Sequence, residues 1–175
     1  TTIGREGNLL EERPEDCRQL HLPAPILTNE QTAWIKNLNQ PGLRARVLST
    51  LFSAQDGPAG VLPAVDRLCA EAEAAVDEGV SILVLSDRWV NGNMAPLPAL
   101  LATGAVHHHL VRQQKRTLCG IVVESGEPRE VMHCCLLLGY GAGAVNPWLA
   151  FEVIEDMFAA GRIDVTDLEK AKQHY

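Results

Sequence analysis

Four short apolar runs, each followed by a helical run, occupy the sequence from about residue 44 onward. Strands that are apolar along their whole length are typical of parallel sheets, because both of their faces are buried. The helices between them supply the crossovers that parallel strands need. The pattern therefore predicts an α/β fold with a four-unit parallel β/α repeat, forming an open sheet or a half-barrel. The predicted strands are residues 46–52, 81–85, 118–123 and 144–145, and the helices between and after them are residues 60–78, 97–114, 128–138 and 147–160.

Residues 1–43 differ from the rest and form a predicted N-terminal arm, with the α/β domain covering residues 44–175. Four prolines interrupt the arm, which limits it to short elements. One of these is a predicted helix with Trp34, Ile35 and Leu38 on a common face. Because the arm is too irregular to form its own core, we expect it to wrap over a neighbouring domain or partner.

Local signals predict where three of the helices begin. Thr28 and Gln31 have the spacing of a capping box. Asn146 followed by Pro147 is typical of an N-cap and a first helical residue. Thr166, with a glutamate three residues later, predicts the start of a last, charged helix.

Composition narrows the classes of partner and location. The chain has 175 residues, enough for one domain with a sizeable core. Its net charge of −7 and the lack of a dense basic run argue against nucleic acid as a partner. It has no apolar run long enough for a membrane span. The five cysteines, an odd number without C-x-x-C spacing, indicate reduced core residues and a cytoplasmic location.

Polar residues gather where three of the predicted strands end. In parallel α/β folds the carboxyl ends of the strands share one edge, and ligands bind there. This edge is a candidate polar pocket or channel mouth. The alternative is that the same residues only cap loops and form an Asp/Arg ion pair. The candidate residues are Ser86, Asp87, Arg88, Glu124, Ser125, Gly126 and Asn146.

Three consecutive histidines, His107, His108 and His109, lie within the predicted helix of residues 97–114. Successive helical residues point roughly 100° apart, so three in a row do not converge on one metal ion. A helical zinc pair needs histidines four residues apart, and no such partner is present. We therefore predict one buried, hydrogen-bonded histidine, with the other two exposed or at an interface.

Glycines alternate in residues 139–143, which read GYGAG. The dinucleotide-binding fingerprint is G-x-G-x-x-G after a strand, whereas this motif follows a predicted helix. It predicts a helix end and a tight turn, although glycines also let a small molecule approach the backbone. The sequence also lacks a nucleophile elbow and a P-loop. We therefore assign no catalytic, metal-binding or cofactor-binding residue.

Several stretches, in order, make the chain resemble the central domain of the glutamate synthase large subunit. They are residues 85–88 (LSDR), 98–110 (PALLATGAVHHHL), 123–131 (VESGEPREV), 139–147 (GYGAGAVNP) and 149–152 (LAFE), together with GNLLE at 7–11 and PILT at 25–28 in the arm. The resemblance covers nearly the whole chain. The chain departs from the family pattern at Trp89, Met132 and Trp148.

The resemblance implies a non-catalytic connecting domain, excised from an oxidoreductase of glutamate biosynthesis and nitrogen metabolism. In the parent, an amidotransferase domain releases ammonia from glutamine, and a domain with FMN and an iron–sulfur cluster makes glutamate. The central domain lies between them and helps to form the ammonia channel. Both catalytic domains are therefore the expected partners, and neither cofactor is expected in this domain.

Two alternatives remain open. In the first, the chain is a self-standing flavin- or phosphate-binding α/β enzyme that uses Ser125, Gly126 and the glycines of residues 139–143. In the second, it is a scaffold without a channel. Apolar patches left by missing domains would also favour self-association.

Overall fold

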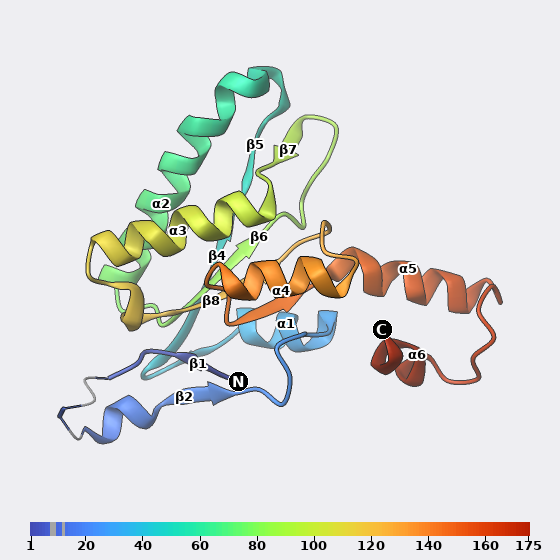
Figure 1. Ribbon diagram of the computed structural model, residues 1–175, viewed down its shortest axis with the longest axis horizontal. Helices are drawn as coiled ribbons and strands as arrows, with labels where there is room; N and C mark the ends of the chain where they lie inside the picture. The colour runs from blue at the N-terminus through green and yellow to red at the C-terminus, as the bar shows by residue number, and fades with distance from the viewer. Residues whose placement is uncertain (8–9, 12) are drawn as a thin grey trace.

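A central sheet of four parallel strands and one antiparallel edge strand organises the molecule (Figure 1). The structure is a computed structural model that describes residues 1–7, 10–11 and 13–175. The strand order is β3-β4-β6-β8-β9, and β3 pairs antiparallel with β4. Within the described residues the sheet is open, with β3 and β9 at its edges, and no barrel forms. The strands are β3 (Asn39–Gln40), β4 (Leu43–Ser49), β6 (Ile82–Ser86), β8 (Gly120–Glu124) and β9 (Ala144–Asn146).

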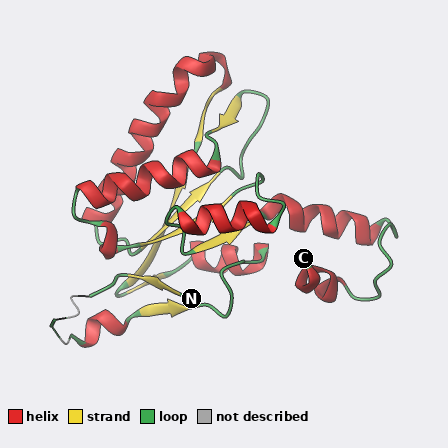
Figure 2. Cartoon of the chain, in the orientation of Figure 1, coloured by secondary structure: helices red, strands yellow, loops and turns green. Residues whose placement is uncertain are grey.

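The parallel β/α repeat is confirmed, and its helices connect neighbouring strands. Helices α2 (Val61–Asp77), α3 (Ala99–Arg112) and α4 (Val131–Gly139) link successive parallel strands, and α5 (Trp148–Ala159) follows the last one. Because crossovers are right-handed and each moves one strand in the same direction, α2, α3 and α4 lie on one face of the sheet (Figures 1 and 2).

The sheet has a hydrophobic core on each face. Successive side chains of a strand point to opposite faces. In β6, Leu83 and Leu85 pack under the crossover helices, whereas Ile82 and Val84 pack on the opposite face. All four are buried, which explains why this strand is apolar without alternation.

The N-terminal arm covers the face that the crossover helices leave open. Its elements are the hairpin of β1 (Thr2–Gly4) and β2 (Gln19–His21), a short 3-10 turn (Pro14–Cys17) and α1 (Asn29–Lys36). Ile3, Leu27 and Ile35 from these elements complete the second core. The arm thus packs on the sheet of its own chain; whether it is a separate domain stays a prediction. Asn8 and Leu9 of the GNLLE motif lie outside the described residues.

Two expectations for α1 have different outcomes. The capping box is confirmed, since the Thr28 hydroxyl accepts from the Gln31 amide and the Gln31 side chain accepts from the Thr28 amide. The predicted common apolar face is wrong for Trp34, which is 57% exposed while Ile35 and Leu38 are buried.

The arm also covers one edge of the sheet. Its residues 25–27 form backbone hydrogen bonds with Val145, so the edge of β9 is paired.

The predicted strand of residues 46–52 is wrong in extent, because the chain leaves the sheet at Thr50. There the Thr50 amide still donates to the Ser86 carbonyl, but the Thr50 carbonyl accepts from Leu97. The next strand, β5 (Leu51–Ser53), forms a separate hairpin with β7 (Met94–Pro96). The sequence had indicated only a loop at the position of β7. The remaining 3-10 turns are residues 54–60 and 116–118.

The last helix, α6 (Leu168–His174), begins differently from the prediction. Asp167, and not Thr166, is its N-cap, and its side chain accepts from the Glu169 amide. Helices α5 and α6 pack on each other beside α1, where Lys172 pairs with Glu30 and Glu155. In the described part of the chain we find no helix whose length and apolar character suit a membrane crossing.

Candidate functional site

The carboxyl ends of β6, β8 and β9 lie side by side. Ser86, Glu124 and Asn146 are the last residues of these strands, and the strand register pairs Ser86 with Glu124 and Glu124 with Asn146. All three side chains are buried. The parallel sheet therefore brings together the residues that sequence analysis placed at one edge, and we call them, with Asp87, Arg88, Ser125 and Gly126, the strand-end cluster.

Glu124 is the centre of one half of the cluster. Its Oε2 accepts from the Ser86 hydroxyl at 2.5 Å, and its Oε1 accepts from Lys36 Nζ at 2.5 Å. The carboxylate is only 3% exposed, so this cation offsets the cost of burying its charge. Sequence reasoning missed Lys36, which lies in the last turn of α1. The available signal was an acidic residue ending a buried strand, because such a group needs a charged partner.

Asp87 is the centre of the other half. Its two oxygens accept from the Ser125 hydroxyl at 2.6 Å, from the indole Nε1 of Trp148 at 2.6 Å and from the Gly126 amide at 3.1 Å. Asp87 is 5% exposed. Trp148, which sequence analysis had noted only as a departure from the family pattern, is thus part of this cluster.

Arg88 lies at the rim of the cluster, and its ion pair corrects the sequence interpretation. It pairs with Glu152 of α5, and not with Asp87. Its guanidinium also lies over the Trp148 ring, 4.8 Å from the ring centroid. The indole is therefore held between a carboxylate that accepts its N–H and a cation on its face.

Asn146 is not a helix cap, contrary to the prediction. Pro147 occupies the cap position, and no side chain caps α5. The Asn146 amide instead donates to the Leu27 carbonyl at 2.8 Å and to Asn29 Oδ1 at 3.0 Å, which ties β9 to the arm. Its own Oδ1 is the one buried side-chain polar atom, among the residues that the structure describes, that has no hydrogen-bond partner. A buried acceptor without a donor costs about 1–3 kcal/mol.

The chemistry of the cluster is that of a closed polar network. Both buried carboxylates accept several hydrogen bonds from the protein, which leaves neither free to act on a substrate.

A hollow of about 700 Å³ adjoins the same edge of the sheet at Ser49, the last residue of β4, which pairs with Ser86. Arg67 also lines it, but donates to the Ser49 and Leu51 carbonyls and to Glu71.

The three histidines have separate environments. His107 Nδ1 accepts from Arg116 Nε at 2.9 Å, His108 is exposed, and His109 contacts Glu73 at 2.8 Å. The prediction of one buried, hydrogen-bonded histidine differs from the structure, in which two histidines, His107 and His109, are half-buried and hydrogen-bonded. Burial, and then the Arg116 charge, lower the pKa of His107 below its usual 6.5.

The described residues offer no group of side chains suited to a metal ion or an iron–sulfur cluster. No group of three or more His, Cys, Asp or Glu side chains in this part of the chain is placed to hold a metal. Burial raises the pKa of the Cys119 thiol to about 11, whereas a cluster ligand must be a thiolate.

Three glycines at the candidate flavin or phosphate site are packed against side chains. A Cβ on Gly141 would lie 2.2 Å from His107 Nδ1, one on Gly143 3.2 Å from Ile3, and one on Gly126 3.2 Å from Trp148. Gly139, which ends α4, has open space around its Cβ position, and Gly141 has φ +113°, as the predicted helix end and turn require. Gly126, Gly141 and Gly143 therefore permit close packing within the protein and leave little space for a ligand against them.

Comparison with known proteins gives one consistent family. The model of the glutamate synthase central domain matches residues 1–175. Similar proteins include the NADH glutamate synthase of Schizosaccharomyces pombe (46% identical over 87% of this chain) and the NADPH glutamate synthase large chain of Bacillus subtilis (40% over 100%). The chloroplastic ferredoxin-dependent glutamate synthase of Spinacia oleracea is 34% identical over 99% of the chain. The chain spans only 7%, 11% and 11% of these three proteins.

Proposed function

This chain belongs to the glutamate synthase central domain family, and we propose that it connects the glutaminase and FMN-binding domains of a glutamate synthase and helps to form the ammonia passage between them. The domain does no chemistry itself in this proposal. Its contribution to glutamate synthesis is to hold two active sites together and to keep the ammonia formed at one of them from escaping.

The size of the chain relative to its relatives supports the connecting role. Proteins named for NADH, NADPH and ferredoxin all match it over most of its length, although it is about a tenth of each. A unit shared by enzymes with different electron donors suits a role that does not depend on the donor.

The unpartnered Asn146 Oδ1 is the observation that carries the passage proposal. Ammonia is small, uncharged and a hydrogen-bond donor, so a buried carbonyl oxygen can bind it without moving a proton. The neighbouring carboxylates of Glu124 and Asp87 already accept hydrogen bonds from the protein, so Asn146 Oδ1 is the acceptor that remains for ammonia. The hollow at Ser49 lies at the same edge of the sheet, next to the strand that carries Ser86.

FMN and the iron–sulfur cluster belong to other domains in this proposal. The resemblance implies both in the parent, and no group of His, Cys, Asp or Glu side chains among the described residues is placed to hold a metal. The cytoplasmic location remains part of the proposal; the spinach relative is named as chloroplastic, so the compartment differs among similar proteins.

The test is a measurement of ammonia leakage in the full-length enzyme. Ser86→Val and Asn146→Leu remove polar atoms from the strand-end cluster and add apolar bulk. We expect both variants to release more free ammonia per glutamine hydrolysed and to form glutamate from glutamine several-fold more slowly. Glutamate formation from added ammonium salt should change less than twofold.

Ser81→Val is the matched control. Ser81 is also a buried serine flanking β6, but at its other end, where it bonds Gly42 and Arg44. A similar loss of stability without leakage is expected there. If the Ser86 and Asn146 variants fold and couple glutamine to glutamate like the parent, the domain is a scaffold without a passage.

A further inference from the structure

Helix α4 is almost entirely apolar and yet lies at the surface. Its sequence, VMHCCLLLG, has no Asp, Glu, Lys or Arg, and of its residues only Leu137 is buried. Val131 is 78% exposed and Met132 66%. A surface helix of a soluble domain normally carries charged residues on its outer side, so this helix is suited to being covered.

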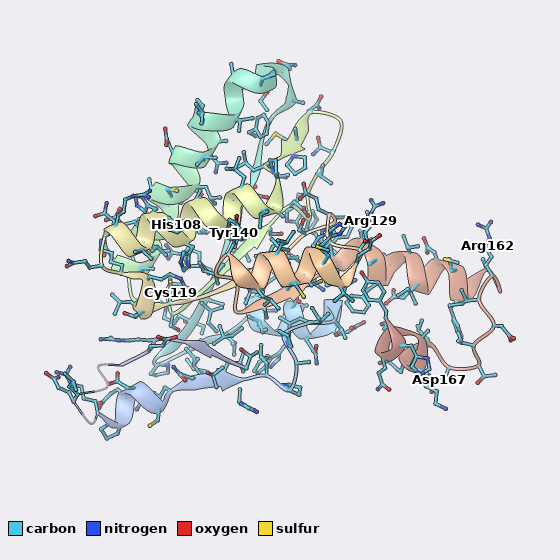
Figure 3. All side chains as sticks on the ribbon, in the orientation of Figure 1. His108, Cys119, Arg129, Tyr140, Arg162 and Asp167 are labelled. Carbon is cyan, nitrogen blue, oxygen red and sulfur yellow. The ribbon has the colours of Figure 1, made fainter. Side chains whose placement is uncertain are left out.

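The exposed apolar residues of α4 form a stripe that continues onto α3. Met132, Leu136 and Tyr140 follow one another at four-residue intervals, so they share one side of the helix. Tyr140 packs beside Gly104 of α3, where an added Cβ would lie 3.3 Å from the tyrosine ring. Figure 3 shows Tyr140 and His108 on these two adjacent helices.

Two hollows, of about 200 and 610 Å³, mark the junction of the helices, and Leu100 lines both. They lie along the stripe, since Leu136 lines the smaller and Tyr140 the larger. Leu101, which is 44% exposed, lines the larger hollow as well. We call Leu101, Val131, Met132, Leu136 and Tyr140, with these hollows, the α3/α4 face. Hollows of this kind accept apolar side chains of a partner.

The length of the relatives indicates what covers this face. The family unit is joined to about eight times its own length of further polypeptide in the proteins that match it. Glu127 lines the smaller hollow and Arg112 the larger, but the five named side chains of the face carry no formal charge. A charged partner surface would lose hydration against these five side chains without gaining an ion pair. An apolar surface elsewhere on the same polypeptide would lose no such hydration, and the length of the relatives makes one available.

We infer that the α3/α4 face is the seat of another domain of the same full-length polypeptide, held mainly by apolar contact. This inference rests on the proposed connecting function and assigns it a surface. The strand-end cluster and the face are different parts of the domain, so the passage and the seat are tested by separate measurements.

Cysteine labelling of the full-length enzyme tests the seat. Cys135 is exposed on α4, one turn after Val131 and next to Leu136 of the face, and Cys17 is exposed on the 3-10 turn of the arm. A maleimide is added to the native and the denatured enzyme, and each cysteine is followed by peptide mass spectrometry. We expect native Cys135 to react at least tenfold more slowly than denatured Cys135, with Cys17 giving the rate of an exposed thiol.

A charged variant separates a covered face from an unreactive thiol. Met132→Glu should restore Cys135 labelling at least fivefold, because it places a charge in the apolar contact. Leu62→Glu, at a leucine of α2 that is 73% exposed, is the matched control and should leave labelling unchanged.

If Cys135 in the native enzyme is labelled within twofold of the denatured rate, the inference is overturned. It is also overturned if the protection of Cys135 disappears when the enzyme is diluted, because a second copy of the enzyme would then be what covers the face. Protection of Cys135 without ammonia leakage in the Ser86 variant would support the seat and overturn only the passage. Ammonia leakage in the Ser86 variant together with a freely labelled Cys135 would support the passage and overturn only the seat.

Discussion

Replacing Asp87 by asparagine tests whether the strand-end cluster holds the domain together. The carboxylate accepts from the Ser125 hydroxyl, the Trp148 indole and the Gly126 amide. The asparagine oxygen can keep the Trp148 and Gly126 bonds, which share Oδ1, while Ser125 turns its hydroxyl to accept from the new amide group. The variant then loses only the extra strength of bonds to a charged acceptor, roughly 1 kcal/mol for each bond.

We therefore expect Asp87→Asn to lower the free energy of unfolding by about 2–3 kcal/mol. Asp87→Ala leaves the indole and the Gly126 amide as buried donors without acceptors, and should cost about 4–5 kcal/mol. Urea unfolding of the chain, followed by far-UV circular dichroism, measures both values. The asparagine variant should also lower Tm by roughly 4–10 °C for a chain of this size.

The indole provides an internal check on this reasoning. Trp148→Phe should cost about 1 kcal/mol less in the Asp87→Asn background than alone, because the bond it removes there is no longer to a charged group. Asp56→Asn, at an exposed carboxylate, should stay within about 0.5 kcal/mol. A cost below about 1 kcal/mol for Asp87→Ala would refute the network as a source of stability.

Three other predictions follow from single contacts. The pKa of His107 is lowered in the folded chain, so the stability that neutral His107 contributes is complete above pH 6.5 and is lost as the pH falls below that value. His107→Gln, whose side-chain oxygen still accepts from Arg116, should flatten this part of the curve of unfolding free energy against pH. Gly141→Ala should cost more than about 3 kcal/mol by urea unfolding, because of its positive φ and the 2.2 Å approach to His107, whereas Gly139→Ala should be neutral or slightly stabilising. Lys172→Met should raise amide hydrogen exchange in α6 at least tenfold without changing α3, because its carboxylate partners on α1 and α5 lose their cation.

The β/α repeat was predictable because its signals are local. Apolar runs such as residues 81–85 mark strands buried on both faces, and the helical spacing of residues 60–78 marks an amphipathic helix. The limits of these elements differ from the structure by a few residues. The β5–β7 hairpin was missed, since most of β5 continues the apolar run of β4 and the three residues of β7 have no pattern distinct from a loop.

The strand-end cluster was predictable as a set of positions but not as a set of contacts. A parallel sheet must place Ser86, Glu124 and Asn146 at one edge, whatever their partners. The interpretation of Asp87 and Arg88 as an ion pair failed because neighbours in sequence need not point toward each other. Each of them bonds to residues of α5 or of the turn after β8.

The fold class, the family and the edge at which polar groups collect follow from the sequence alone, because they depend on periodicity and on motifs within short windows. The donors that meet the buried carboxylates are known only from the folded chain: Lys36 reaches Glu124 across 88 residues, and Trp148 reaches Asp87 across 61. The folded chain also shows that the arm fills the second face of the sheet and that no other part of the described residues covers the outer side of α4. Such pairings depend on how the elements pack, and no local pattern records the distance or the direction between two side chains that meet only after folding.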